Sequence, residues 1–415
     1  MQIDIINIPP TTTKNLLFVG LILLLTSPAF ALGSDARNLL LIGAMGLSPL
    51  IFILIPAITR TAIYLYIIII LSILCPLINH PETMRWSTVL YGCMFNLYFI
   101  ALSTLLAFSR VSQNDIIKLL KFLLLAYTIT LLIQQTCVLL GIPIFNVSNY
   151  NIRQPWKLNS LMSEPEHSGR MIALLMYAYL SIKSIKAGKE SLIESWKEDK
   201  LIWSAFLWCM LTSLSAGAYL FLFIVLSKFL TVKNCLKVTG ITLIFLLIIN
   251  ALFEPTALNR FIKFFFAILT FDLDMIYQVD QSAALRIVPS ILCIQKINLL
   301  SIDGWFGCGV DYVSRFMSDY LPGVENGYTG GGMFLYAVEY GFLAFIVLSV
   351  VSFRLCYDRD NIIPTILFWI FSVLLVGINS QLSWSTIMML YIVKYCKLIN
   401  SDNEYISTGI SSITK

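Results

Sequence analysis

Long apolar segments separated by short polar connections account for most of this 415-residue chain. Most of them approach the length of about 20 residues that an α-helix needs to cross the hydrocarbon core of a bilayer. They lie near 15–32, 38–58, 61–79, 88–108, 116–142, 168–187, 201–215, 216–231, 236–252, 331–353, 361–379 and 383–399. The pattern therefore predicts an all-α polytopic integral membrane protein, with about twelve transmembrane helices in a single membrane domain spanning 1–415.

Two parts of this pattern allow a second interpretation. The stretch 201–231 can form one long helix, but we divide it at the small and polar residues Ser213, Ser215 and Gly217. The last two apolar segments, joined through 379–381, can form a short hairpin that does not fully cross the membrane. Either alternative changes the number of spans and leaves the fold class unchanged.

The composition agrees with a membrane protein and narrows the possible partners. Hydrophobic residues make up 58% of the chain and charged residues 12%, whereas an ordinary soluble protein is about 25% charged. The net charge of +5 includes no basic cluster with interleaved aromatic residues, so nucleic acid is not an expected partner. The nine cysteines show no CxxC or metal-ligand spacing, and there are only two histidines. We therefore expect no metal site and no cofactor.

Lysine and arginine are distributed unevenly between the two sides of the predicted bundle. If the N-terminus lies inside, the inner connections carry most of the 28 positive residues, including five lysines between 183 and 200. The outer connections are short and nearly free of positive charge, except for 143–167 and 253–330. Because positive loops stay in the cytoplasm, we expect a multi-pass protein with both termini cytoplasmic and these two long segments on the outer side.

The second outer segment has a helical pattern of its own. Residues 257–271 are strongly apolar but include two cations, which is typical of a helix lying in the membrane interface. Residues 282–300 also predict a helix, kinked at Pro289. Long loops without low complexity usually have a function, so we expect both outer loops to contribute to a site.

The first outer segment ends in the sequence SEPEHSGR, Ser163 to Arg170, at the predicted start of a membrane helix. Ser163 and Glu166 have the spacing of a capping box, in which each side chain binds a backbone amide of the other. Pro165 then falls in the first turn, where its missing N–H costs little. The sequence therefore predicts a helix whose N-cap is Ser163.

This helix start concentrates groups that can carry chemistry. Glu164, His167 and Arg170 follow one another at positions i, i+3 and i+6 and line one side of the first two turns. Gly169 leaves room for another group to approach the backbone, and a helix N-terminus beside an arginine suits a phosphate group. The alternative is structural, because Glu166 and Arg170 also have the spacing of a common surface ion pair.

Three stretches together resemble the bacterial O-antigen polymerases (Wzy-like) of the O-antigen polymerase/ligase superfamily. The sequence SEPEHSGR is similar to the family's "EPS" helix start, and Ser213-Leu214-Ser215-Ala216-Gly217 is similar to its "SxS/R-G" turn. Arg286 begins a helix that leads to Phe306-Gly307-Cys308-Gly309, as in the family. Taken alone, these last glycines are equally consistent with a plain turn. The chain departs from the family at Glu166-His167, where a serine and an apolar or aromatic residue are more common.

The resemblance implies a GT-C-like glycosyltransferase of the bacterial inner membrane, with its site on the periplasmic face. Such an enzyme moves a growing glycan from undecaprenyl diphosphate onto the non-reducing end of a new lipid-linked repeat unit, in lipopolysaccharide O-antigen biosynthesis. The expected partners are lipid-linked repeat units, membrane lipid and a chain-length regulator protein. O-antigen ligases share the fold and the donor but use a different acceptor.

This chemistry assigns roles to the charged residues of the two periplasmic loops. The leaving diphosphate needs positive charge, which arginine supplies through bidentate contacts, and the outer arginines are Arg170, Arg286, Arg315 and Arg153. Glu164 or His167 is the expected base for the attacking sugar hydroxyl. The aromatic residues that can pack against sugars, or form part of the interfacial belt, are Trp305, Tyr312 and Tyr328. We expect metal-independent transfer.

A lipid-linked oligosaccharide flippase or other transporter is the main alternative from a different class. Transporters place charges near the middle of the bilayer and contain broken helices. The predicted span interiors are almost free of charge, and Glu339 is the nearest exception. The long charged outer loops favour the enzyme.

Overall fold

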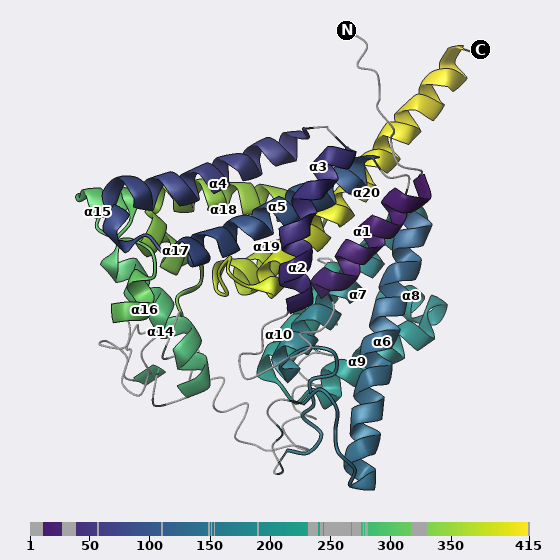
Figure 1. Ribbon diagram of the computed structural model, residues 1–415. Coiled ribbons are helices and arrows are strands. Elements are labelled where there is room, and N and C mark those ends of the chain that lie inside the picture. Colours follow the sequence, from purple (N-terminus) through teal and green to yellow (C-terminus); the bar gives the residue numbers. More distant parts are fainter. Residues whose placement is uncertain are drawn as a thin grey trace.

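The computed structural model describes residues 11–26, 39–55, 58–108, 111–147, 154–188, 191–230, 281–316 and 330–413, together with a few single positions between them. Every regular element within these ranges is a helix and none is a strand, so the expected all-α class is confirmed (Figure 1). The apolar segment 236–252 and the expected interfacial helix 257–271 lie outside the described residues.

The described helices follow most of the predicted apolar segments. The first half of the chain forms α1 (Thr11–Thr26), α2 (Leu39–Leu47), α3 (Ile51–Leu54), α4 (Arg60–Asn79), α5 (Trp86–Phe108), α6 (Gln113–Leu140), α7 (Pro165–Ala187), α8 (Leu192–Glu198), α9 (Lys200–Thr212) and α10 (Ala216–Leu226). The second half forms α14 (Gln281–Lys296), α15 (Ile302–Phe306), α16 (Tyr312–Phe316), α17 (Gly332–Tyr340), α18 (Phe342–Cys356), α19 (Ile362–Trp369), the π-helical turn η6 (Ile370–Leu374) and α20 (Gln381–Ile413). Two predicted details are confirmed, because α9 and α10 are separate helices and α14 contains Pro289.

Four of the described helices are long and apolar enough to cross a bilayer. They are α4, α5, α6 and the Gln381–Asn400 part of α20. The others are shorter or, in the case of α7, carry a polar first turn. These apolar helices indicate a membrane-embedded helical protein, and the total of twelve spans stays a prediction.

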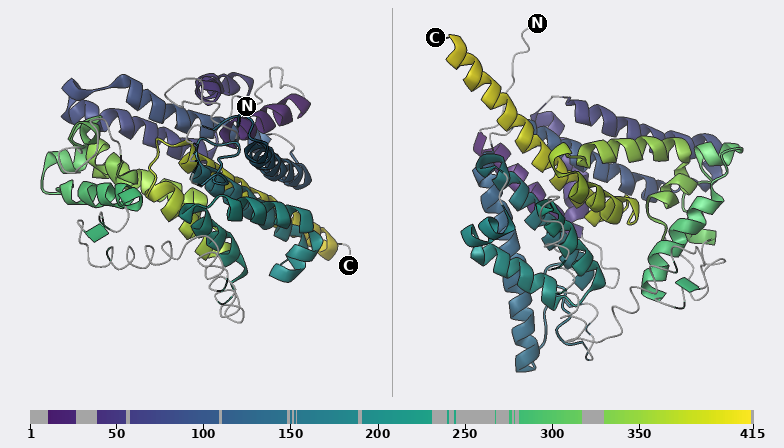
Figure 2. Two further views of the ribbon diagram at one scale, coloured as in Figure 1. Left: turned by 90° about the horizontal axis from the view of Figure 1, so that it is seen from below. Right: turned by 180° about the vertical axis from the view of Figure 1, so that it is seen from behind.

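Helix α7 lies at the centre of the bundle, where α6, α9, α10 and α20 pack around it (Figures 1 and 2). No residue from Met171 to Ile182 is more than 4% exposed. A helix that is apolar on every side is stable only when other helices enclose it. The start of α7, which the sequence marks as a site, is therefore attached to the most enclosed helix of the described structure.

The closest helix crossing in this centre joins the first turns of α7 and α10. A Cβ atom placed on Gly169 would lie 2.5 Å from the Cβ and 3.0 Å from the Cα of Ala218. A Cβ on Gly217 would lie 2.7 Å from the Glu166 side chain. Small residues permit such backbone contact between membrane helices. The expected room at Gly169 is real, but Ala218 of α10 fills it.

The expectation of a single span over 331–353 is wrong. The chain breaks at Gly341, which has φ +90°, and α17 and α18 lie on either side of it. A Cβ on Gly341 would lie 2.2 Å from the carbonyl oxygen of Trp305, so α15 approaches the backbone too closely for any side chain. The segment 38–58 is also interrupted, by a 3₁₀ turn that contains Pro49.

Ion pairs join the helices at two ends of the bundle. At one end, Asp199 accepts from Lys121 (2.9 Å) and Lys183 (2.6 Å) and so joins α6, α7 and the start of α9. At the other end, Arg85 and Asp311 pair at 3.0 Å and join the α4–α5 connection to α16. The residues of the first group all belong to the inner side predicted from the lysine and arginine distribution. The residues of the second group all belong to the predicted outer side. We call these the inner and the outer end, and the face that each end meets in the cell stays a prediction.

We expect Gly169→Ala to lower the unfolding temperature of the detergent-purified protein, because overpacking at a close crossing costs about 1–3 kcal/mol. Adding Ala218→Gly should restore part of the loss, since it removes the nearer of the two atoms that the new methyl group meets. Gly20→Ala is the matched control, because a Cβ there meets nothing within 4 Å. Equal unfolding temperatures for Gly169→Ala and Gly20→Ala would contradict the observed crossing.

Candidate functional site

The start of α7 differs from the predicted capping arrangement. The N-cap is Glu164, in extended backbone conformation (φ −138°, ψ 151°), with no capping bond from its side chain, and Pro165 is the first helical residue. The predicted N-cap at Ser163 is therefore wrong by one residue. The Ser163 hydroxyl lies instead 3.1 Å from Nδ1 of His167 and fixes that ring against the helix start.

The Glu166–Arg170 pair is present, but it is not a surface pair. Arg170 donates to the Glu166 carboxylate, and the two side chains are only 14% and 10% exposed. A second Arg170 nitrogen lies 3.4 Å from the carbonyl oxygen of Phe371 in η6, and the guanidinium lies over the ring of Phe221. The Nε–H of Arg170 has no hydrogen-bond partner among the described residues. A buried guanidinium with an unused donor is a suitable group for binding an anion.

Glu164 and His167 lie on the more exposed side of the same turn. Their side chains are 47% and 36% exposed, and His167 Nε2 is 3.9 Å from a carboxylate oxygen of Glu164. The turn therefore separates an exposed carboxylate–imidazole pair from a buried carboxylate–guanidinium pair. Either exposed group can accept a proton from a substrate hydroxyl.

A polar network that the sequence analysis did not identify holds this helix start in place. Buried Gln134, near the end of α6, accepts from the backbone N–H of Ser160 (2.8 Å) and donates to the Phe145 carbonyl (3.0 Å). Asn159 donates to the carbonyl of Met162, which lies two residues before the N-cap. The only feature of the sequence that could have indicated this network is Gln134, a glutamine within an apolar segment. A glutamine side chain is costly to bury unless it is hydrogen-bonded.

Two of the three aromatic residues expected to contact sugars, Trp305 and Tyr312, belong to a second cluster, formed by α15 and α16 at the outer end. Trp305 is 41% exposed, and its Nε1 donates to the Leu299 carbonyl (2.9 Å). The ring of Tyr312 lies 5.5 Å below the Lys296 ammonium. Arg315 is exposed and donates to the carbonyl oxygens of residues 310 and 311, so part of its guanidinium stabilises its own turn.

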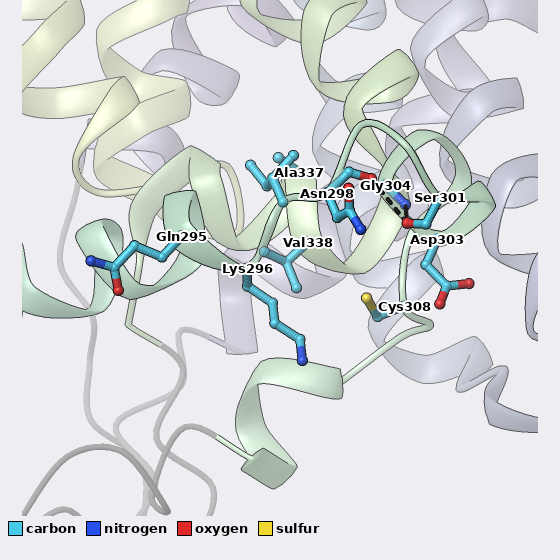
Figure 3. A pocket seen from close by; sticks show the side chains of 10 residues that line it. Gln295, Lys296, Asn298, Ser301, Asp303, Gly304, Cys308, Ala337 and Val338 are labelled. Carbon is cyan, nitrogen blue, oxygen red and sulfur yellow. Dashed lines mark hydrogen bonds between the residues drawn. The ribbon is translucent and has the colours of Figure 1, made fainter.

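The α4–α5 connection attaches this second cluster to the bundle. Asn79 donates to Asp303 (2.9 Å) and to the carbonyl of Gly307 (2.7 Å). His80 lies between two carboxylates, with Nδ1 2.9 Å from Glu82 and Nε2 3.3 Å from Asp303. Behind Asp303, a cavity of about 290 Å³ opens between the end of α14, α15 and α17 (Figure 3).

The structure thus divides the predicted site residues between two places. Glu164, His167 and Arg170 meet at the start of α7, while Trp305, Tyr312 and Arg315 lie in the second cluster. Arg153 and Tyr328 lie outside the described residues, as does the side chain of Arg286 on α14. The turn η6 connects the two places, because it accepts from Arg170 and a Cβ on Gly332 would lie 2.3 Å from the Leu374 carbonyl oxygen.

Within the described ranges, no group of three or more His, Cys, Asp or Glu side chains could hold a metal ion. Comparisons with protein families, with characterised proteins and with solved structures found no match to this chain. The fold and the site therefore define a helical, membrane-embedded protein with two polar clusters, one at the start of α7 and one at the outer end around α15.

We expect the attachment through His80 to depend on pH. Hydrogen bonds to Glu82 and then Asp303 raise the pKa of His80, and bonds from Asn79 and then His80 lower the pKa of Asp303. A histidine with a raised pKa stabilises the folded state below its unfolded value of roughly 6.5 and loses this contribution as the pH rises through its folded value. The attachment should be strongest between the lowered pKa of Asp303 and the raised pKa of His80.

Hydrogen–deuterium exchange of residues 298–309, corrected for intrinsic rates, measures this attachment. Protection from exchange should decrease as the pH rises past the pKa of His80, and His80→Gln should abolish this pH-dependent decrease. The matched control is His167→Gln, which changes the only other histidine and should leave the pH-dependent decrease in protection unchanged. Identical profiles for the His80 variant and the wild type would rule out the histidine as the cause.

Proposed function

We propose that this protein is a membrane glycosyltransferase that extends a polyprenyl-diphosphate-linked glycan, acting as an O-antigen polymerase. The observation that carries the proposal is the start of α7, where Arg170 is largely buried and keeps one donor unused. Two possible bases, Glu164 and His167, lie one turn away on the exposed side. This arrangement suits a reaction with an anionic leaving group and a hydroxyl nucleophile.

In this proposal the acceptor hydroxyl attacks C1 of the donor sugar from the side opposite the diphosphate. The new oxygen–carbon bond forms, the bond from C1 to the diphosphate breaks, and the hydroxyl proton passes to Glu164 or His167. The displacement inverts the anomeric configuration. The diphosphate leaves as an anion, so its stabilisation by positive charge is the main electrostatic requirement.

The charge balance at the helix start shows what else the proposal requires. Glu164 and Glu166 place two carboxylates beside the single guanidinium of Arg170. A diphosphate therefore needs further positive charge, which we assign to Arg153 and Arg286 of the two long outer loops. Arg315 is the weaker candidate, because it already donates to carbonyl groups of its own turn.

One observation favours a transporter as the second candidate. The breaks at Gly341 and η6 are interrupted helices, as in many transporters, and Glu339 is buried beside the first of them. However, the Glu339 carboxylate accepts from the backbone N–H of Val313 (3.0 Å) and so fixes α16. This structural role and the clustering at the α7 start favour the enzyme.

Removal of this gene from its host and analysis of the surface polysaccharide on a gel test the function. We expect the ladder to collapse to a single repeat unit, to return with the wild-type gene, and not to return with Arg170→Ala. Arg170→Lys should restore little, because an ammonium cannot reproduce the bidentate geometry of a guanidinium. Loss of all repeat units would indicate a ligase or a flippase instead, and a full ladder with Arg170→Ala would exclude this residue as a diphosphate ligand.

The choice of base is tested by polymerisation in vitro with purified lipid-linked repeat unit. We expect Glu164→Gln, which keeps the shape and removes the charge, to lose at least 100-fold of the rate, as expected for removal of a general base. The matched comparison is His167→Asn, which should lose less. A dead His167 variant together with near-normal turnover by Glu164→Gln would assign the base to the histidine.

A further inference from the structure

The cavity in the second cluster has a mixed lining, in which polar side chains face the apolar residues Ile297, Ala337 and Val338. Its walls come from the last turn of α14, the segment leading into α15, the turn after α15, and α17. Figure 3 shows Lys296 and Asp303 on opposite sides of Cys308, with Asn298 and Ser301 above them in the view. Amide, hydroxyl, carboxylate and ammonium groups therefore share a single space with an apolar wall.

The charges of this lining are balanced. Lys296 supplies the cation and Asp303 the anion, and Asn79 and His80 hold Asp303 through its Oδ1. A phosphate in this space would lie beside an ionised carboxylate, which is unfavourable. A neutral ligand that both donates and accepts hydrogen bonds meets no such repulsion, and a sugar has many groups of this kind.

The size and the neighbouring rings point to the same class of ligand. A cavity of about 290 Å³ is at the lower limit of small-molecule sites, which span roughly 300–1,000 Å³. Neither ring lines the cavity, but the ring of Tyr312 lies beside the lining residue Lys296, and Trp305, whose ring packs against Phe342, directly follows the lining residue Gly304. Aromatic rings with a polar border are suited to the apolar face of a pyranose.

We propose that this cavity binds one sugar unit of the lipid-linked glycan, away from the reacting end. The inference rests on the proposed polymerase function for its ligand. The cavity is lined by residues 295–308 and by α17, not by the start of α7, so the proposed sugar is not the one undergoing transfer. Binding energy from such a remote sugar positions the chain for the reaction.

Cys308 provides a direct measurement, because its thiol lines the cavity and is partly exposed, whereas the other described cysteines are buried. The full-length purified protein is treated with a small methanethiosulfonate, and the label on Cys308 is quantified by peptide mass spectrometry. The probe is the neutral oligosaccharide repeat unit released from the host's own lipid-linked intermediate. We expect it to slow labelling of Cys308 at least fivefold, and inorganic diphosphate to leave the rate unchanged.

Two matched variants test the lining. Asp303→Asn should raise the oligosaccharide concentration for half-protection at least tenfold, because a hydrogen bond to a charged group is lost. Asp311→Asn is the control, since Asp311 pairs with Arg85 nearby but does not line the cavity, and its φ of +59° suits asparagine. It should change the half-protection concentration less than twofold. Unchanged labelling of Cys308 in both variants without oligosaccharide shows that the cavity is intact.

The outcomes separate this proposal from the polymerase function. Labelling does not require turnover, so protection in a protein that fails to polymerise would support a sugar site while overturning the proposed reaction. Absence of protection in a protein that polymerises would overturn the sugar site alone. Protection by inorganic diphosphate, or equal weakening by Asp303→Asn and Asp311→Asn, would also overturn it.

Discussion

Helix α7 is enclosed by four helices, and α10 crosses its first turns so closely that only the methyl group of Ala218 lies between the two backbones at Gly169. The same crossing places the Cα of Gly217 against the side chain of Glu166, and Glu166 in turn pairs with Arg170. The position of the buried charges therefore depends on the same close helix crossing that packs the central helix. Any residue larger than glycine at either position would move the helix start and the guanidinium together.

Burial makes this ion pair unusual, because desolvation of two charges commonly costs as much as their attraction returns. The surroundings of Arg170 reduce that cost only in part. A carbonyl of η6 and the ring of Phe221 contact the guanidinium, but Nε–H stays without a partner. The proposed function gives this incompletely satisfied cation a role, because an anionic substrate group near the turn would balance its charge.

The two polar clusters use different means of holding their geometry. Around α7, buried Gln134 and Asn159 fix the loop before the helix start through hydrogen bonds to backbone groups, and neither of these two side chains is titratable. Around α15, the attachment runs through His80, Glu82 and Asp303, which are partly exposed and titratable. The proposed division between a site of chemistry and a site of sugar binding follows this difference, since a substrate-holding element has to release its ligand.

The sequence by itself determined the all-helical class, the positions of most helices, the division near Ser213 and a helix start within SEPEHSGR, because these depend on local hydrophobicity and on spacing along one helix. Only the tertiary structure decided that Gly169 accommodates α10, that Glu166 and Arg170 are buried, and that Gly341 breaks an apolar segment beside Trp305. These features depend on the approach of chain segments far apart in sequence. No local pattern records how close two such backbones come.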